Sequence, residues 1–405
     1  MMSSLSKLAG PGLVVSFVLA SCGDDGRESE GMVNTNVATG IATLPGDSSV
    51  GTTGMTGATD GTATDPGSAD SDPVTTTQGE GSTAPKFDLG DPPETTMSPD
   101  SGDVDCTIDP NQEGCKCSIP DHAPCDAGTQ DPFNAMGLNC PGELQVNATK
   151  NGDGLAFGVR NSFGQAGVFN PREGTQYAVI GSGVVAELNQ TTPGGDSNQN
   201  PSLCNDILGG SQDPGPNLPA PLKTNAVGGD CQQNPGLVGT GDCSSTVQDQ
   251  FQQGMNAFDY TELRFVLQVP PGVVSLSYDF AFFSTEYPHY YGEQYNDMYI
   301  GWLESEKWTG NISFDAMGNP ISLNAGFLDH KDDGGNLPAL AGTCMRQHAG
   351  TNWLQTTAGV TPGETITVVF AVFDLYDPVL DSYVFLDNFK WGCNPVGKPQ
   401  TMPPG

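Results

Sequence analysis

Carboxylates that surround a hydrophobic run near residue 380 are the side chains best suited to chemistry. The stretch DLYDPVLDSYVFLDNFKWGC, residues 374–393, contains Asp374, Asp377, Asp381 and Asp387. Such residues can form a catalytic pair, bind a cation, or solvate the ends of strands. Calcium takes six to eight oxygen ligands from carboxylates, amides and backbone carbonyls. The short link that carries Asp374, Asp377 and Asp381 therefore predicts a Ca²⁺ site.

Asp387 belongs to a separate position. If residues 382–391 form a straight strand, Asp381 and Asp387 stand about 20 Å apart at roughly 3.3 Å per residue. They cannot serve one ion without a bend, so we expect Asp387 to find partners on other loops. The weaker candidates for metal ligation are Glu286, Asn296, Asp297 and Asp387 itself, and the first three are also the expected partners of Asp387. The alternative is that these side chains only cap turns, as Asp and Asn often do.

Tyrosines between these acidic segments suggest a binding surface. The segment YPHYYGEQY, residues 287–295, is polar, contains glycine and includes Tyr287, Tyr290, Tyr291 and Tyr295. Exposed aromatic rings stack on sugars or anchor a protein partner. We therefore expect this loop to bind an extracellular glycan or protein.

Catalysis is the less favoured interpretation. Glu286 and an aspartate could form the acid–base pair of a glycoside hydrolase, but a chain with 48 Asp and Glu residues brings carboxylates together by chance. Nucleophile-elbow, HExxH and P-loop motifs are missing from the sequence. The four histidines show no zinc-ligand spacing. We expect no enzymatic activity.

The elements that must position these residues are strands. Hydrophobic segments rich in Val, Tyr, Phe and Thr are bounded by turns such as Pro271-Gly272 and Pro362-Gly363. The expected strands cover residues 175–188, 263–269, 273–284, 296–304, 364–374 and 382–391. One short helix is expected, over residues 132–138. The pattern predicts an all-β, jelly-roll-like β-sandwich over residues 131–395, with long loops tied by disulfides.

Two strands have informative periodicity. In residues 275–283, Leu276, Tyr278 and Phe280 alternate with smaller or polar residues, which predicts one core face and places Asp279 at the surface. Residues 365–373 are apolar at both parities, which indicates a central strand buried on both faces.

The first residues predict export and a lipid anchor. Residues 1–21 form an expected signal peptide, because the apolar run is too short to span a bilayer. Leu19-Ala20-Ser21-Cys22 resembles the bacterial lipobox, which implies that Cys22 is lipidated and binds the membrane. Gly23 after Cys22 implies an outer-membrane or cell-surface location.

The next segment, residues 22–103, consists mainly of Gly, Thr, Ser, Asp and Pro. We expect a disordered acidic tether, because so few apolar residues cannot offset the chain entropy lost on folding. A flexible tail is expected at residues 396–405. The net charge of −34 argues against nucleic acid as a partner.

Cysteine usage agrees with export. Without Cys22 ten cysteines remain, and an even number in an exported chain predicts disulfides whose pairing the sequence leaves open. They are Cys106, Cys115, Cys117, Cys125, Cys140, Cys204, Cys231, Cys243, Cys344 and Cys393. Residues 104–130 are expected to form a small disulfide-stapled segment, and residues 191–245 a long loop tied down by bridges.

Two long motifs resemble a known family. FAFFSTEYPHYYGEQYNDMYIGWL, residues 280–303, and ITVVFAVFDLYDPVLDSYVFLDNF, residues 366–389, are similar to signatures of the choice-of-anchor L domain. Residues 131–140 and 177–187 resemble its first helix and strand. The resemblance implies a secreted or surface-anchored bacterial protein without enzymatic activity. We therefore predict a surface lipoprotein that acts in adhesion or ligand binding; the alternatives are a secreted acidic hydrolase acting on glycans and a structural envelope component.

Overall fold

The computed structural model describes residues 117–143, 146–189, 204, 208 and 212–404. The chain divides into Met1–Gly90 and Asp91–Gly405, and the described residues belong to the second unit. The expected signal peptide, Cys22, the tether, Cys106 and Cys115 lie outside them. Within the described part, no helix has the length and apolar character needed to cross a bilayer.

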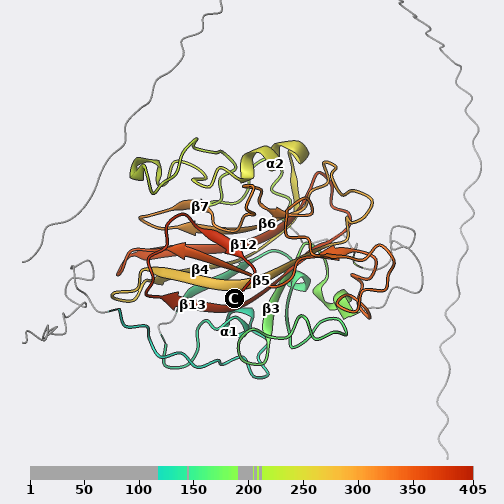
Figure 1. Cartoon of the computed structure of the whole chain (residues 1–405), viewed down its shortest axis with the longest axis horizontal. Helices are drawn as coiled ribbons and strands as arrows, with labels where there is room; N and C mark the ends of the chain where they lie inside the picture. Colours follow the sequence, from blue (N-terminus) through green and yellow to red (C-terminus); the bar gives the residue numbers. More distant parts are fainter. Residues whose placement is uncertain (1–116, 144–145, 190–203, 205–207, 209–211, 405) are drawn as a thin grey trace, which may run out of the picture. The chain divides into compact units, whose positions relative to one another are not determined.

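The described residues form two antiparallel sheets (Figure 1). The first has the order β1 (Asn147–Asn151), β4 (Ala257–Gln268), β12 (Thr365–Leu375), β6 (Met298–Glu304), β7 (Thr309–Asn311), and β8 (Ile321–Ser322) also pairs with β6. The second has the order β14 (Gln400–Met402), β11 (Leu354–Gly359), β5 (Ser275–Ser284), β13 (Ser382–Gly392), β3 (Tyr177–Gly181), β2 (Phe157–Arg160). The short strand β10 (Ala349–Gly350) joins β5 to β9 (His330–Lys331).

The connectivity is that of a jelly roll. The strand orders β3-β13-β5-β11 and β4-β12-β6-β7 arise because the chain crosses between the sheets from β3 through β6, as in two Greek keys wrapped into a double sheet. The expected jelly-roll-like β-sandwich is confirmed. The helices are α1 (Pro132–Ala135) and α2 (Val247–Gly254), with 3₁₀ turns η1 (Gly154–Ala156), η2 (Val185–Asn189) and η4 (Pro235–Leu237).

Aromatic packing between the sheets forms the central core. Tyr278 and Phe280 of β5 face Phe370 of β12 and Phe265 of β4 within one buried cluster. The rings of Tyr278 and Phe370 lie 4.5 Å apart between centroids. Burying this apolar surface is the main favourable contribution to folding.

Strand β12 is buried on both faces, as its sequence predicted. Phe370 points into the core between the sheets, whereas Val369 and Phe373 point outward into a second cluster with Phe251 of α2. Helix α2 was not expected from the sequence. A side chain at Gly254 would place its Cβ 2.3 Å from Leu375, so the helix ends on a residue small enough to lie against β12.

The prediction that Asp279 lies at the surface is wrong, because Asp279 is fully buried. The outer face of β5 is covered as well, and Phe283 packs there against Phe163 and Phe169 of the segment between β2 and β3. Arg172 of the same segment pairs with Asp279, with 3.0 Å between Nε and Oδ2. The periodicity of a strand can indicate which face is polar, but it cannot indicate that a loop from another part of the chain covers that face.

Two expected segment boundaries also differ. The strand expected at residues 175–188 ends at Gly181 and is followed by η2, and the expected helix at 132–138 is limited to Pro132–Ala135. The expected flexible tail contains β14, whose Thr401 pairs with Thr356 of β11. Pairing with an existing edge strand orders a segment that has little apolar content of its own.

The described disulfides are Cys117–Cys393, Cys125–Cys140, Cys204–Cys344 and Cys231–Cys243. Cys117 and Cys125 form disulfides with cysteines outside the segment 104–130, namely Cys393 and Cys140. The expectation that this segment is stapled within itself is therefore wrong for these two cysteines. The expectation for the long loop at 191–245 is met by Cys204, which ties it to Cys344, and by the bridge within it.

We expect Phe370→Ala to lower the free energy of unfolding by about 3–5 kcal/mol, because the substitution leaves a cavity in the core between the sheets. Urea unfolding would measure the change. Met317→Ala is the control, since Met317 is 86% exposed and its truncation should change stability by less than about 0.5 kcal/mol. A loss below about 1 kcal/mol for Phe370→Ala would contradict the assigned core.

Candidate functional site

Buried carboxylates gather at one end of the sandwich. Glu286 follows β5, Asp297 precedes β6, Asp374 lies near the end of β12, and Asp381 precedes β13. All four are at most 2% exposed.

The strand register brings them together. Ser284 of β5 pairs with Ser382 of β13, and Phe373 of β12 pairs with Met298 of β6. Two strands therefore end, and two begin, at the same edge of the sandwich. The sequence distance between Asp297 and Asp374 is large, but antiparallel pairing makes their strand ends neighbours.

Asp297 connects the two sheets at this edge. Its Oδ1 accepts a hydrogen bond from the backbone N–H of Leu375 at 3.1 Å, and its Oδ2 accepts one from the Ser382 hydroxyl at 2.7 Å. Leu375 belongs to β12 and Ser382 to β13, which lie in different sheets. One carboxylate thus holds both sheets in place.

Asp381 is enclosed by its neighbours. Its Oδ2 accepts a hydrogen bond from the Tyr383 hydroxyl at 2.9 Å. A Cβ at Gly183 would lie 1.7 Å from the same oxygen, so only glycine fits in the segment after β3. The Gly-Ser-Gly sequence at 181–183 therefore allows the backbone to approach the carboxylate closely.

Asp374 and Glu286 are less well satisfied. Neither oxygen of Asp374, and not Oε2 of Glu286, accepts a hydrogen bond from a described residue. Among the described residues, no Lys, Arg or His forms an ion pair with Glu286, Asp297, Asp374 or Asp381. Buried charge without a partner is costly, so such groups take up a proton or bind a cation.

The pKa shifts express this cost. Burial raises the pKa of Asp374 well above its usual value, and the nearby carboxylates of Asp297 and Asp381 raise it further. The nearby Ser182 hydroxyl partly offsets this rise in pKa, although it is not placed to form a hydrogen bond with Asp374. Burial and then Asp297 likewise raise the pKa of Glu286. At this end of the sandwich, the exclusion of water and the neighbouring carboxylates favour the neutral form of each carboxyl group over the charged form.

Two carboxylates of this group were missed in the sequence. Burial raises the pKa of Asp381, and the charges of Asp259 of β4 and Glu187 of η2 raise it further. Glu187 accepts a hydrogen bond from the backbone N–H of Cys204 at 2.9 Å. Asp259 has a φ of +46°, uncommon for a residue other than glycine. Neither lies in a motif that would have connected it with Asp374.

The expected calcium ligands are only partly brought together. Asp374 and Asp381 are close enough for the charge of Asp381 to add to the burial that raises the pKa of Asp374. Asp377 is half-buried, and its Oδ1 accepts a hydrogen bond from the Val379 N–H at 3.1 Å, as in a turn cap. Its charge still adds to the burial that raises the pKa values of Glu286 and Asp297. The amide of Asn296 donates to Gln250 at 3.0 Å and so turns toward α2. In the part of the chain that is described, no three acidic, His or Cys side chains form a ready metal cage.

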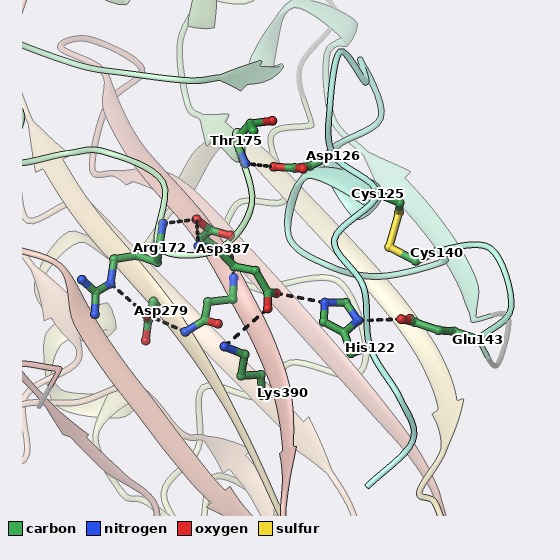
Figure 2. A network of polar contacts seen from close by, with 12 residues as sticks. His122, Cys125, Asp126, Cys140, Glu143, Arg172, Thr175, Asp279, Asp387 and Lys390 are labelled. Atoms are coloured by element: carbon green, nitrogen blue, oxygen red, sulfur yellow. Dashed lines mark hydrogen bonds and ion pairs between the residues drawn. A yellow bond between two sulfur atoms is a disulfide. The ribbon is translucent and has the colours of Figure 1, made fainter.

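Asp387 has other partners than those expected. Its Oδ2 accepts hydrogen bonds from the backbone N–H groups of Arg172 at 2.6 Å and Glu173 at 3.2 Å (Figure 2). Opposite it, Asp279 binds Arg172 and the Asn388 amide. The expected contacts of Asp387 with Glu286 or Asn296-Asp297 are therefore wrong, because the segment between β2 and β3 covers this part of β13.

The same network holds the first described segment on the sandwich (Figure 2). His122 lies between Glu143, at 2.6 Å, and Glu173, at 3.0 Å. Asp126 accepts hydrogen bonds from the backbone N–H groups of Thr175 and Gln176. These contacts tie residues 117–143 to the segment before β3.

A groove of about 370 Å³ lies beside this network. Its lining includes His122, Leu138, Leu267, Phe389 and Trp391. Leu267, Phe389 and Trp391 belong to the ends of β4 and β13 that lie away from Asp259 and Asp381, whereas His122 precedes α1 and Leu138 follows it.

Tyrosines form an exposed patch beside the buried carboxylates. Tyr295 contacts Tyr290 and Tyr376, with ring centroids 4.7 Å apart in both pairs. Tyr291 is 45% exposed and Tyr376 is 43% exposed. We call Tyr290, Tyr291, Tyr295 and Tyr376 the tyrosine patch. Tyr291 belongs to it by its place in the loop, since its ring contacts Tyr287 and lies under the Lys331 ammonium. It shares the loops 285–297 and 375–381 with Glu286, Asp297 and Asp381.

The patch differs from the expected ligand-binding set by one exchange, because Tyr376 takes the place of Tyr287. Tyr287 is only 7% exposed and packs with Leu323 and Leu328, while its hydroxyl donates to Asp333. Tyr376 replaces it at the surface. Its φ of +93° is unfavourable for a bulky residue, and sequence patterns contain no sign of this conformation.

Comparisons with known proteins identify no family. The chain matches no family model and no curated protein. One solved structure is similar, the carbohydrate-binding module TmCBM61 in complex with β-1,4-galactotriose, with a TM-score of 0.23 and 9% identity over 61% of this chain and 88% of that chain. So low a score carries no argument about the ligand of this chain.

Asp387 predicts a pH-dependent contribution to stability. Burial raises its pKa from 3.8 to about 7, although three backbone N–H groups oppose the shift. In the unfolded chain Asp387 loses its proton near pH 4, whereas in the folded chain it keeps the proton up to about pH 7. The contribution of Asp387 to the free energy of unfolding is therefore complete below about pH 4 and is lost as the pH rises to about 7. Urea unfolding between these pH values should show a smaller decline in Asp387→Asn than in the unsubstituted chain.

Asp315→Asn is the control of opposite sign. Hydrogen bonds from Asn319, Gly326 and Met317 outweigh burial and lower the pKa of Asp315. Its contribution is therefore present above about pH 4 and is lost on acidification. An unchanged slope between about pH 4 and 7 in Asp387→Asn would contradict the assignment to Asp387.

Proposed function

We propose that this chain is a non-catalytic, lipid-anchored surface protein whose jelly-roll domain binds an extracellular glycan through the tyrosine patch. The observation that carries the proposal is the contact series of the partly exposed rings of Tyr290, Tyr295 and Tyr376, with Tyr291 exposed in the same loop. Loops held by a rigid scaffold are common sites of recognition.

The composition of the patch favours a sugar. Tyrosine offers an apolar ring for stacking on a sugar face and a hydroxyl for hydrogen bonding. His289, Glu293 and Gln294 are exposed in the same loop and add polar groups. The chain has a net charge of −34, which repels anionic chains. A neutral glycan is therefore the ligand class of choice.

Burial of the carboxylates argues for binding without hydrolysis. A glycoside hydrolase needs two carboxyl groups on either side of a bound glycosidic bond. Glu286 and Asp297, which flank the loop 287–295, are 2% and 0% exposed. A glycan chain that rests on the tyrosine rings cannot reach them without opening the sandwich.

The anchor and location remain proposals from the sequence. The lipobox-like Leu19-Ala20-Ser21-Cys22 supports a lipidated surface protein. The disulfides of the described part suit an oxidising compartment. The resemblance to the choice-of-anchor L domain implies a secreted or surface-anchored protein and so supports the same location. The two motifs that carry this resemblance also contain the residues of the patch.

A glycan array probed with the detergent-solubilised full chain tests the proposal. We expect binding to neutral glycans, and Tyr291→Ala and Tyr376→Ala should each weaken the affinity about tenfold or more, the effect of removing an aromatic anchor. Leu155→Ala is the control, because Leu155 is 61% exposed and lies outside the patch.

The alternatives predict other results. A structural envelope component would bind no glycan on the array, and a hydrolase would release reducing ends from the bound glycan. Equal affinity in Tyr291→Ala, Tyr376→Ala and Leu155→Ala would place the binding site elsewhere. Melting curves of the three variants should lie close together, since each of the three side chains is at least 43% exposed.

A further inference from the structure

Asp374 differs from other buried aspartates of the described part, such as Asp242 and Asp279, in its hydrogen bonding. The carboxylate of Asp242 accepts hydrogen bonds from Ser244, Thr246, Val247 and Asn311. Asp279 is bound by Arg172, Gln355 and Asn388. The fold thus supplies donors to buried carboxylates elsewhere. Asp374 is fully buried, and neither of its oxygens has a hydrogen-bond donor among the described residues.

We propose that Ca²⁺ binds at this end of the sandwich, with Asp374 as its main ligand and Asp297 as its second carboxylate. This inference does not depend on the glycan ligand. The two carboxylates lie close enough to interact directly, and the Ser182 hydroxyl is near Asp374. Asp381 and Glu286 add negative charge around the same point.

The donor chemistry selects the ion. The polar side chains near Asp374 and Asp297 are carboxylates and serine hydroxyls, which are hard oxygen donors, and the backbone N–H of Leu375 also bonds Asp297. Calcium prefers such donors, whereas zinc and copper prefer imidazole and thiolate. Because the described residues contain no ready cage of three acidic, His or Cys side chains, carbonyl oxygens and water must complete the six to eight ligands.

A bound ion would join strands of both sheets. Asp297 already accepts hydrogen bonds from Leu375 of β12 and Ser382 of β13. An ion between Asp297 and Asp374 would neutralise both carboxylates and would fix the loops that carry the tyrosine patch. Its loss should therefore loosen this end of the domain first.

Protons are the competing occupants of these carboxylates. Two close carboxyl groups can share a proton and so avoid repulsion without a metal. In that case the protein would be insensitive to calcium. Weak association of calcium with the acidic surface is a further alternative, which high salt suppresses because exposed charges are screened.

The test compares the full chain in detergent after chelation and after addition of CaCl₂. We expect a saturable rise in melting temperature of about 3 °C or more, with Mg²⁺ less effective. Calorimetric titration should give a dissociation constant between about 10⁻⁶ and 10⁻³ M. The rise should persist in about 0.5 M NaCl, since a buried site is little screened.

Matched aspartate variants locate the site. Asp374→Asn should abolish the calcium-dependent rise, whereas Asp387→Asn should keep it, because Asp387 is bound by backbone N–H groups. Loss of the rise in Asp387→Asn with retention in Asp374→Asn would overturn the assignment. No rise in the unsubstituted chain, or a rise that disappears in high salt, would overturn the proposal itself.

Terbium luminescence covers the case in which Asp374→Asn does not fold. Tb³⁺ bound by the unsubstituted chain should be excited through Tyr383, whose hydroxyl lies 2.9 Å from Asp381. Calcium should displace it and quench the emission. Absence of sensitised emission, or emission that calcium leaves unchanged, would overturn the proposal. Glycan binding is not measured in any of these experiments, so their failure leaves the proposed function to its own test.

Discussion

Burial of the central strands on both faces is the constraint on which this structure depends. Strand β12 packs Phe370 toward β5 and Phe373 toward α2, and β13 and β5 are covered on their outer face by Phe163 and Phe169. Long connections are needed to provide this cover, and two disulfides, Cys204–Cys344 and Cys231–Cys243, tie down connections of this kind. Polar residues on these strands consequently lie away from water, where each needs a partner.

The chain meets this need in two ways. At the middle of β5 and β13, Asp279 and Asp387 receive donors from Arg172, Glu173 and Asn388. At the strand ends, Asp374 and Glu286 carry oxygens that no described residue satisfies. The pair Asp279 and Asp387 and the pair Asp374 and Glu286 are equally shielded from water, so the two pairs differ in the number of hydrogen-bond donors that the described residues supply to them. The second arrangement is the one that a cation would complete.

The position of the acidic end relates the two proposals. The loops 285–297 and 375–381 carry buried carboxylates and exposed tyrosines within a few residues of each other. Asp297 joins Leu375 and Ser382 across the sheets, so the loops that present the patch start from a fixed edge. A ligand surface on such loops loses little conformational entropy on binding, which favours affinity from a small contact area.

The sequence alone determined the jelly-roll class, the doubly buried strand at 365–373 and the placement of Tyr290, Tyr291 and Tyr295 on one loop, because hydrophobic period and turn residues are local signals. Only the tertiary structure decided that Asp297 rather than Asp377 lies beside Asp374, that Asp279 is buried, that Tyr376 joins the patch and which cysteines pair. These outcomes depend on strand register and loop cover, which bring together residues far apart in the chain and leave no local pattern.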